Sequence, residues 1–372
     1  MLKIYSALFI YLSLFGCSLA QSSESIQWWE PATSEFPVIE GQGWYSQTEA
    51  PYDRLPAKAK ATVREAVWDL SKNATGLMIR FHTNAPRIMV RYTVTGSHAM
   101  NHMPATGVTG VDLYAISDDG QWQWSRANRE FSDTIVYDYQ GLEPDRYYPQ
   151  KGAEYRLYLP LYNQVKWLEI GVGSESDFRP LPTRPQQPIV VYGTSIAHGA
   201  CASRPGMSWA NILSRKLDHP LINLGFSGNG RLEPEVVSLL TELDAKLYVI
   251  DCLPNLTNVE LYPEEELRKR ITSTIDQLKA QKPQVPILLV EHAGYTDDLM
   301  QPSRKQAYSR VNRIQEEVFE EYQAKGVEQL YYLSKTQIGL ELDDMVDGTH
   351  PNDLGMMHYA LAYEKAIKDI FE

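Results

Sequence analysis

Five residues in the second half of the chain offer the groups that serine-dependent acyl transfer requires. Ser195 carries a hydroxyl nucleophile, and His350 carries an imidazole that can take up the hydroxyl proton. Asp347 lies three residues before His350, where a carboxylate can orient the imidazole and fix its tautomer. We therefore predict that Ser195, Asp347 and His350 are catalytic. We also predict an oxyanion hole formed by the main-chain N–H groups of Ser195 and Gly228 and by the side-chain amide of Asn255.

The elements that must position these residues are the strands of a parallel sheet. Continuous apolar runs of the kind buried on both faces occur at residues 188–193, 221–224, 247–250, 287–290 and 330–333. Amphipathic stretches at 264–281 and 304–325 predict helices between the strands, and a helix over 354–371 closes the chain. This alternation predicts a doubly wound α/β fold whose five-stranded parallel sheet has the flavodoxin-like order. Ligands bind beyond the carboxyl ends of such strands, which is where the candidate residues lie.

The first half of the chain has a different periodicity. Short alternating runs separated by turns predict strands near residues 77–82, 88–92, 156–159 and 167–172. Residues 174–187 contain three prolines and few aliphatic side chains, which is typical of a linker. We therefore expect an antiparallel β-sandwich of jelly-roll type over residues 21–173, a linker over 174–187, and the α/β domain over 188–372.

The N-terminus predicts export. Residues 4–16 form an apolar run that follows a lysine and is shorter than the roughly 20 residues of a membrane-spanning helix. Ser18-Leu19-Ala20 offers a cleavage site, so residues 1–20 are predicted to be a signal peptide of a secreted or periplasmic protein. An alternative comes from Leu14-Phe15-Gly16-Cys17, which resembles a lipobox. In that case Cys17 carries a lipid anchor, and the protein is an outer-membrane lipoprotein.

Charge and cysteine content limit the partners and the redox state. The 372 residues include 47 acidic and 35 basic side chains, a net charge of −12 that repels phosphate backbones and excludes nucleic acid as the expected partner. No transmembrane span is expected. Once residues 1–20 are removed, Cys201 and Cys252 remain in an oxidising compartment. They form either one disulfide bridge, as their expected positions on adjacent elements allow, or two buried free thiols.

Four blocks of sequence carry a resemblance to a known family. They are Gly193-Thr194-Ser195, Asn223 through Gly228, Pro254-Asn255 and Asp347-x-x-His350. In this order they resemble the blocks of the SGNH-type, GDSL-like hydrolases over residues 188–372. Thr194 stands where the GDSL signature has an aspartate that is not catalytic in the family. In the first half, Gly110-Val111-Asp112-Leu113-Tyr114 is similar to the Gly-x-Asp-Leu-Tyr motif of the β-domains that precede bacterial SGNH esterases.

The resemblance implies the same catalytic and oxyanion residues as the strand-end argument. It also implies a carboxylic ester hydrolase, resembling the carbohydrate acetyl-esterases, that removes small acyl groups from acetylated oligo- or polysaccharides without a metal or other cofactor. Two alternatives stay open. One is a lipid or lysophospholipid esterase of the same family, and the other is a glycan-binding protein whose hydrolase domain is inert.

Three further histidines are candidates for other functions. His98 and His102 have a spacing that resembles a metal site, but no third ligand is near them in the sequence. An ordinary loop that leans over the active edge is therefore the favoured interpretation. His292 follows the fourth strand, where it either lines the acyl pocket, competes as a base, or is a hydrogen-bonded structural histidine, and we favour the last.

Overall fold

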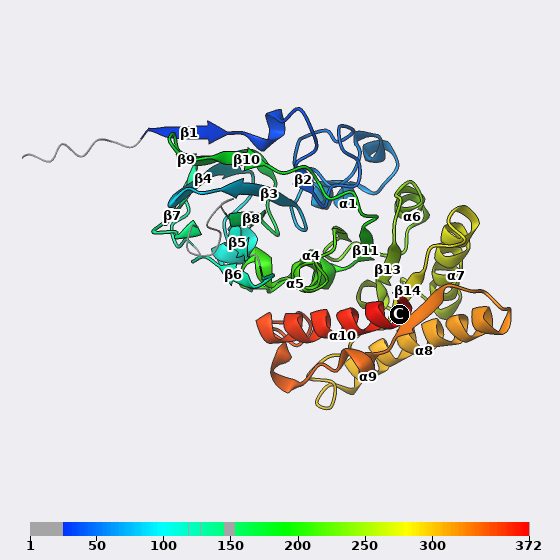
Figure 1. Ribbon diagram of the computed structural model, residues 1–372. Helices are drawn as coiled ribbons and strands as arrows, with labels where there is room; N and C mark the ends of the chain where they lie inside the picture. The colour runs from blue at the N-terminus through cyan, green and yellow to red at the C-terminus, as the bar shows by residue number, and fades with distance from the viewer. Residues whose placement is uncertain (1–24, 118, 127, 145–152, 372) are drawn as a thin grey trace, which may run out of the picture.

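The computed structural model describes residues 25–117, 119–126, 128–144 and 153–371 (Figure 1). The predicted signal peptide and the alternative lipid anchor at Cys17 lie outside these residues. Within them, no helix has the length and apolar character needed to cross a membrane.

The first half of the chain folds into two antiparallel sheets. One sheet has the order β1 (Ile26–Trp29), β9 (Val165–Gly173), β4 (Arg87–Val94) and β7 (Ile135–Gln140). The other has the order β10 (Phe178–Pro180), β3 (Met78–Thr83), β8 (Ala153–Tyr158), β5 (Asp112–Ile116) and β6 (Trp122–Trp124), and β2 (Ile39–Glu40) pairs with β3. Alternate residues of β4, among them Ile88, Val90 and Tyr92, are buried in the core that the two sheets share. The predicted β-rich domain is confirmed.

The second half forms one parallel sheet of five strands. Its order is β12 (Leu221–Gly225), β11 (Ile189–Gly193), β13 (Leu247–Asp251), β14 (Ile287–Val290) and β15 (Leu330–Leu333). Every neighbouring pair in it is parallel. The order is that of the flavodoxin-like fold, as predicted, and every strand coincides closely with an apolar run in the sequence.

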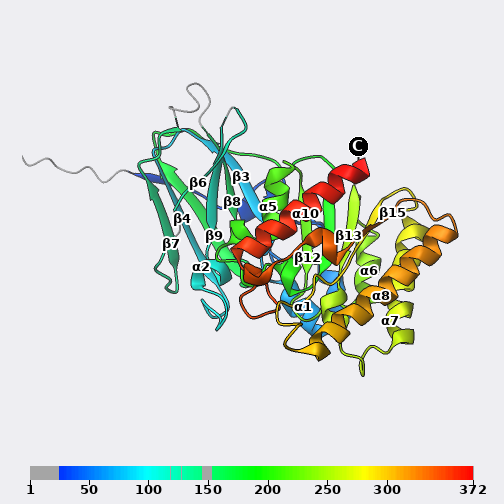
Figure 2. The same cartoon turned by 90° about the horizontal axis from the view of Figure 1, so that it is seen from below.

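Helices cover both faces of the parallel sheet (Figures 1 and 2). One face packs against α6 (Pro234–Leu240), α7 (Glu264–Gln281) and α8 (Pro302–Ala324), and the other packs against α5 (Trp209–Lys216) and α10 (Asp353–Phe371). The short helices are α1 (Glu65–Ser71), α2 (Ala105–Val108), α4 (Ser195–His198) and α9 (Lys335–Ile338). The 3-10 turns are η1 (Pro31–Thr33), η2 (Ala57–Ala61), η3 (Pro205–Met207), η4 (Leu253–Leu256) and η5 (Leu342–Asp344).

Part of the first half packs on the parallel sheet rather than on the β-sandwich. Trp44, Leu55 and Trp68 belong to the same buried cluster as the residues of α6, α7 and α8. Arg54 is almost fully buried, and its Nη1 donates to the carbonyl oxygens of Asn223 (2.8 Å) and Gly225 (3.0 Å) on β12. The sequence changes its periodicity near residues 174–187, but the two halves do not pack as two separate cores, because part of the first half is buried against the parallel sheet.

The segment expected to be a linker contains a strand. Residues Phe178–Pro180 form β10, which pairs antiparallel with β3. The ring of Phe178 packs against Phe81 (centroids 5.3 Å apart) and Trp29 (5.4 Å). Proline is tolerated here because β10 lies at the edge of its sheet, where a missing N–H interrupts no inner ladder.

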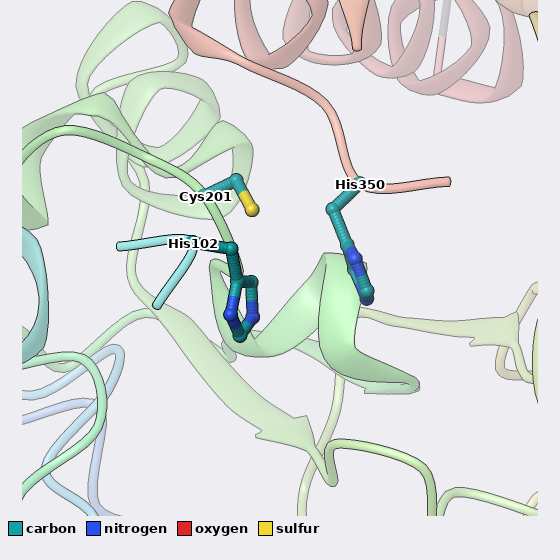
Figure 3. A group of neighbouring side chains, drawn as sticks. All are labelled: His102, Cys201 and His350. Atoms are coloured by element: carbon teal, nitrogen blue, oxygen red, sulfur yellow. The ribbon is translucent and has the colours of Figure 1, made fainter. Parts of the chain in front are cut away.

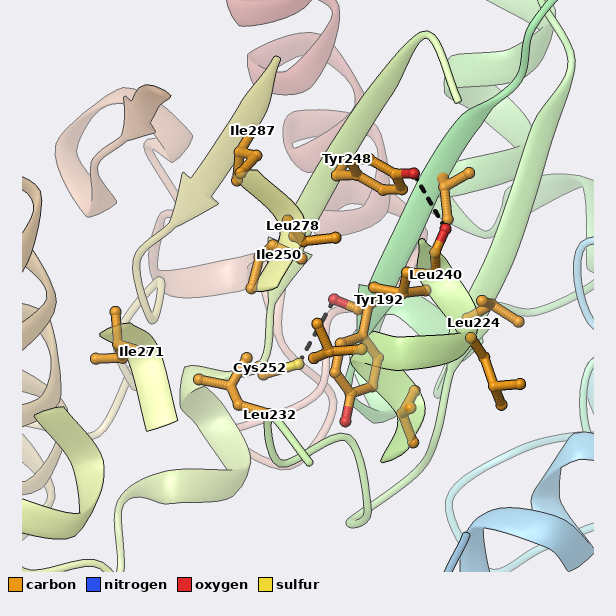
Figure 4. Packing of buried hydrophobic residues seen from close by; sticks show 14 of the residues in the cluster. Tyr192, Leu224, Leu232, Leu240, Tyr248, Ile250, Cys252, Ile271, Leu278 and Ile287 are labelled. Carbon is orange, nitrogen blue, oxygen red and sulfur yellow. Dashed lines mark hydrogen bonds between the residues drawn. The ribbon is translucent and has the colours of Figure 1, made fainter. Parts of the chain in front are cut away.

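Cys201 and Cys252 are free thiols, so the hypothesis of a bridge between them is wrong. Neighbouring residues of a strand point to opposite faces of a sheet, and the two sulfurs belong to different faces. Cys252 continues the face of Tyr192 and Ile250, and its thiol donates to the carbonyl oxygen of Tyr192 at 3.6 Å (Figure 4). Cys201 packs into the cluster on the other side. The elements that carry the two cysteines are adjacent, as expected, but the parallel sheet separates the side chains.

Candidate active site

Ser195 is the first residue of α4, immediately beyond the end of β11. Thr194 is the N-cap of this helix, and its hydroxyl accepts a hydrogen bond from the N–H of Ile196 at 3.3 Å. Thr194 therefore performs the capping role for which aspartate is equally suited. The Ser195 side chain is held at the sheet edge, and the residue is 8% exposed.

Ser195, His350 and Asp347 form a continuous hydrogen-bonded chain. Ser195 Oγ lies 3.0 Å from His350 Nε2, and His350 Nδ1 lies 2.8 Å from Asp347 Oδ2. The other carboxylate oxygen of Asp347 accepts from the main-chain N–H groups of His350 (2.8 Å) and Thr349 (3.0 Å). Burial raises the pKa of the Asp347 carboxyl, but these hydrogen bonds outweigh burial and hold the pKa below its ordinary value. A charged carboxylate therefore faces the imidazole at neutral pH.

A side chain from α8 holds the loop that carries His350. Arg304 Nη2 donates to the carbonyl oxygen of Gly348 at 3.0 Å and to Thr349 Oγ1 at 2.9 Å. The same guanidinium forms an ion pair with Asp297 at 2.7 Å. Because Gly348 and Thr349 lie between Asp347 and His350, Arg304 fixes the main chain that places both side chains. Sequence reasoning missed Arg304, since nothing in its local pattern distinguishes it from an exposed helical arginine.

The predicted oxyanion donors surround the end of β11. Gly228 has φ +67°, which few other residues adopt, and nothing occupies the space beside its Cα. No acceptor among the described residues bonds the main-chain N–H of Ser195 or of Gly228. Asn255 Nδ2 donates to the carbonyl oxygen of Gly230 at 3.1 Å, which leaves the second amide hydrogen uncommitted. Gly230 packs so closely on Gly193 that a Cβ would lie 1.9 Å from the Gly193 oxygen.

Asp112, the acidic residue of the Gly-x-Asp-Leu-Tyr motif, joins the β-rich domain to the segment that follows α4. Its carboxylate is buried and accepts from Arg204 Nη1 (2.9 Å), the N–H of Gly206 (2.7 Å) and Trp124 Nε1 (3.1 Å). The Tyr114 hydroxyl accepts from Arg204 Nη1 at 2.6 Å. The motif therefore has a structural role. Its Asp112 and Tyr114 side chains hold residues 204–206 beside the sheet edge that carries Ser195.

Comparison with known proteins places the chain in a family. Residues 186–368 match the GDSL-like lipase/acylhydrolase family, and residues 26–178 match the N-terminus of the SGNH hydrolase-type esterases. The chain is 31% identical to a putative GDSL-like lipase from Bacteroides ovatus, over 93% of this chain and 98% of that one, with a TM-score of 0.82. The chain belongs to the GDSL-like lipase/acylhydrolase family. It is accordingly a carboxylic ester hydrolase.

Two solved structures of lower identity share the fold of this GDSL-like hydrolase. A salicylyl acyltransferase from a tetracycline biosynthetic pathway is 17% identical, over 93% of this chain and 98% of that one, with a TM-score of 0.73. A family two carbohydrate esterase from Cellvibrio japonicus is 12% identical over the same shares, with a TM-score of 0.57. A search of the curated proteins finds no match.

The loop that carries His98 and His102 does lie over the active edge of the hydrolase. The rings of His102 and His350 are 5.7 Å apart, whereas the ring of His98 lies against Phe131 (6.0 Å). The two loop histidines therefore do not share a site. One ligand atom from each of His102, Cys201 and His350 lies within 4.8 Å of the other two, so these residues could hold a metal ion (Figure 3). No local sequence pattern indicates this group of three, because its members come from three distant segments.

His292 has the structural role that we favoured. It is 2% exposed, and its Nδ1 accepts a hydrogen bond from the N–H of Gly294 at 2.9 Å. Burial lowers the pKa of the imidazole to about 3, so the ring stays neutral. Its ring packs against Tyr295 and Tyr308. Neither Ser195 nor Asp347 hydrogen-bonds to it in the described part of the chain.

Proposed function

We propose that this hydrolase is an exported serine esterase that removes small acyl groups, chiefly acetyl, from carbohydrates. The observation that carries the proposal is the hydrogen-bonded chain from Ser195 through His350 to Asp347. This arrangement supplies a nucleophile, a base and an orienting carboxylate in the order that acyl transfer needs.

In the proposed reaction, Ser195 Oγ attacks the acyl carbonyl carbon while His350 Nε2 takes up the hydroxyl proton. The Asp347 carboxylate accepts a hydrogen bond from the Nδ1–H of the imidazole, which fixes the orientation of the ring, and it stabilises the imidazolium that forms. His350 then protonates the departing sugar oxygen, which leaves as a hydroxyl group while the acyl group stays on Ser195. A water molecule, deprotonated by the same imidazole, releases the carboxylic acid and restores the serine. None of these steps requires a metal ion or a cofactor.

The tetrahedral intermediates need donors for a negatively charged oxygen. We assign this role to the N–H groups of Ser195 and Gly228 and to the free amide hydrogen of Asn255. Each such donor contributes roughly 3–4 kcal/mol to the transition state in related chemistry. The contact between Asn255 and Gly230 supports the assignment, because it fixes the amide at the same sheet edge as Ser195.

The carbohydrate substrate is supported by proteins that share the fold. They include the Cellvibrio japonicus carbohydrate esterase, a family two carbohydrate esterase from Clostridium thermocellum solved with cellohexaose, and an acetyl xylan esterase from the rumen bacterium Butyrivibrio proteoclasticus. The predicted signal peptide over residues 1–20 would bring the enzyme to polysaccharides outside the cell, as a secreted or periplasmic protein. Lipidation at Cys17 would instead retain it at the outer membrane.

Activity assays with graded acyl chains test the proposal. The enzyme is incubated with p-nitrophenyl acetate, with longer p-nitrophenyl esters and with acetylated polysaccharides, and acetate release is measured. We expect the acetyl ester to be preferred and acetate to be released from at least one polysaccharide. A preference for long acyl chains would favour the lipid esterase, and glycan binding without turnover would favour the inert domain.

The variant Ser195→Ala provides the matched control for these assays. It removes only the hydroxyl oxygen, so the fold should be retained while kcat falls on the order of a million-fold. A serine-directed phosphonate should label the wild-type protein at Ser195 and should not label the variant. If Ser195→Ala keeps a tenth of the wild-type activity, another residue is the nucleophile.

A further inference from the structure

Three potential metal ligands from distant parts of the chain meet at the catalytic imidazole. His102 comes from the loop before α2, Cys201 follows α4, and His350 precedes α10 (Figure 3). One nitrogen or sulfur atom of each lies within 4.8 Å of those of the other two. His102 is exposed, Cys201 is buried and His350 is half-buried. The group therefore lies at the boundary between core and solvent, where an ion can enter from solvent.

The ligand set is the kind that binds thiophilic cations. Two imidazoles and a thiolate suit Zn²⁺ and Cu⁺, whereas Mg²⁺ and Ca²⁺ prefer oxygen ligands. Zinc bonds of about 2.0–2.3 Å put the ligand atoms of a tetrahedral site roughly 3.3–3.7 Å apart. Because the ligand atoms lie within 4.8 Å of one another, binding needs them to close by at most roughly 1.5 Å, and His102 is the exposed side chain of the three.

The environment of His350 matches a common feature of metal-binding histidines. Such histidines donate the N–H that does not face the metal to a carboxylate, which fixes the tautomer and increases the basicity of the ligating nitrogen. In this enzyme His350 Nδ1 lies 2.8 Å from Asp347 Oδ2, so Nε2 is the nitrogen that remains for a metal ion. The contact that serves the catalytic imidazole therefore also prepares it as a ligand.

We propose that His102, Cys201 and His350 form an inhibitory site for Zn²⁺ and related thiophilic cations. The inhibitory part rests on the proposed function, because it requires His350 to be the catalytic base. An ion on Nε2 occupies the lone pair that would accept the Ser195 proton and separates the two side chains that now lie 3.0 Å apart. Binding replaces the thiol hydrogen of Cys201 by the metal and releases that proton to solvent. Water fills the fourth coordination position, and removal of the ion restores the enzyme.

Cobalt spectroscopy tests the site without relying on catalysis. Co²⁺ is titrated into the intact Ser195→Ala protein, in which the three ligands are unchanged. We expect a thiolate-to-cobalt charge-transfer band and the intense visible bands of tetrahedral cobalt, displaced by one equivalent of Zn²⁺. The additional change Cys201→Ser should abolish the charge-transfer band, and His102→Ala should weaken Co²⁺ binding on the order of 100-fold. Cys252→Ala is the control, because that thiol lies on the opposite face of the sheet and should leave the spectrum unchanged.

Inhibition assays test the consequence for activity. Zn²⁺ should inhibit wild-type ester hydrolysis reversibly, Mg²⁺ at the same concentration should not, and a chelator should restore the rate. His102→Ala should need on the order of 100-fold more Zn²⁺ for half-inhibition relative to its own uninhibited rate. His98→Ala, in the same loop but packed against Phe131, should behave as wild type.

Two results would overturn the proposal. One is a cobalt spectrum that Cys201→Ser leaves intact, and the other is equal zinc sensitivity of wild type and His102→Ala. Cobalt binding with the expected ligand dependence, but without any zinc effect on turnover, would retain the metal site and reject its inhibitory action. That outcome differs from a failure of the proposed esterase activity, which would appear as absence of turnover before any metal is added.

Discussion

The side chain of Asn255 has two amide hydrogens, and one of them is bonded to Gly230. This contact explains how a side chain on a short 3-10 turn keeps a fixed direction at the sheet edge. The residue is half-buried, so the amide is neither freely mobile nor lost in the core. A donor that is held before the reaction begins is the kind that stabilises a developing charge most strongly.

Asn255→Ala should lower kcat roughly 100- to 1000-fold and leave KM nearly unchanged, because the lost hydrogen bond forms chiefly in the transition state. Steady-state kinetics with p-nitrophenyl acetate measure both parameters. Asn255→Asp retains the size of the side chain but offers oxygen atoms in place of the donor, so it should be at least as impaired. A change confined to KM would assign Asn255 to substrate binding instead.

Asp347→Asn should lower kcat roughly 100- to 10,000-fold, because a neutral amide neither fixes the His350 tautomer nor stabilises the imidazolium. The depressed pKa of Asp347 means that the wild-type carboxylate stays charged as pH falls through the weakly acidic range, and its contribution is lost only below its lowered pKa. Activity from pH 5 to 8 is measured for both proteins. Asp343→Asn, an exposed neighbour in η5, is the control and should retain full activity. Full activity of Asp347→Asn would remove this residue from the mechanism.

At the scale of elements, a buried carboxyl links the parallel sheet to the last helix. Asp251 ends β13, and Tyr363 of α10 donates a hydrogen bond to its Oδ2 at 2.9 Å. Burial raises the pKa of Asp251 to about 7, although the bond from Tyr363 acts in the opposite direction. The unfolded chain loses this proton near pH 3.8, whereas the folded protein keeps it until about pH 7. Stability therefore falls as pH rises through that window and levels off above it.

Asp251→Asn should remove this pH dependence, because an amide does not titrate. Between pH 5 and pH 8, the free energy of unfolding of the wild type should fall by roughly 2–3 kcal/mol more than that of the variant. Urea denaturation at the two pH values measures the difference. The two proteins are compared by how much the free energy of unfolding changes between the two pH values. A constant difference in stability between the amide and the carboxyl therefore does not affect the result. Equal slopes would mean that the carboxyl ionises in the fold at its ordinary pKa.

At the scale of the whole molecule, polar contacts join the two halves of the chain. Only some of these contacts come from residues of a recognisable sequence motif. Asp112 of the β-rich domain binds Arg204 and Gly206 beyond α4, and Arg54 binds two carbonyl groups of β12. The loop that carries Asp347 and His350 is anchored separately by Arg304 of α8. The sheet edge that carries Ser195 is therefore supported from both halves of the chain.

Asp112→Ala should destabilise the protein by roughly 3 kcal/mol, because it removes the charged partner of the largely buried Arg204 and leaves the Gly206 N–H without its acceptor. Denaturant unfolding measures the loss, and Asp112→Asn should be intermediate because it retains one oxygen acceptor. Asp133→Ala, which removes an exposed carboxylate of the same domain, should be close to neutral. If Asp112→Ala unfolds like wild type, the motif does not hold the two halves together.

Much of the fold and of the candidate site could be predicted from the order of residues. Strands such as Leu221–Gly225 and Ile287–Val290 follow apolar runs, because burial on both faces of a sheet favours apolar side chains. Their order then brings Ser195, Asp347 and His350 to one edge, since the carboxyl ends of parallel strands share that edge. The residue types at those ends are enough to indicate the chemistry.

Other features were decided only by tertiary packing. Contacts between distant segments place Cys201 and Cys252 on opposite faces of the parallel sheet. Such contacts also determine the packing of Trp44 and Trp68 on that sheet and the pairing of β10 with β3. The meeting of His102 with Cys201 and His350 is of the same kind. Local periodicity records which side chains of one element are buried. Local periodicity does not indicate which other element buries those side chains, because that depends on how the whole chain packs.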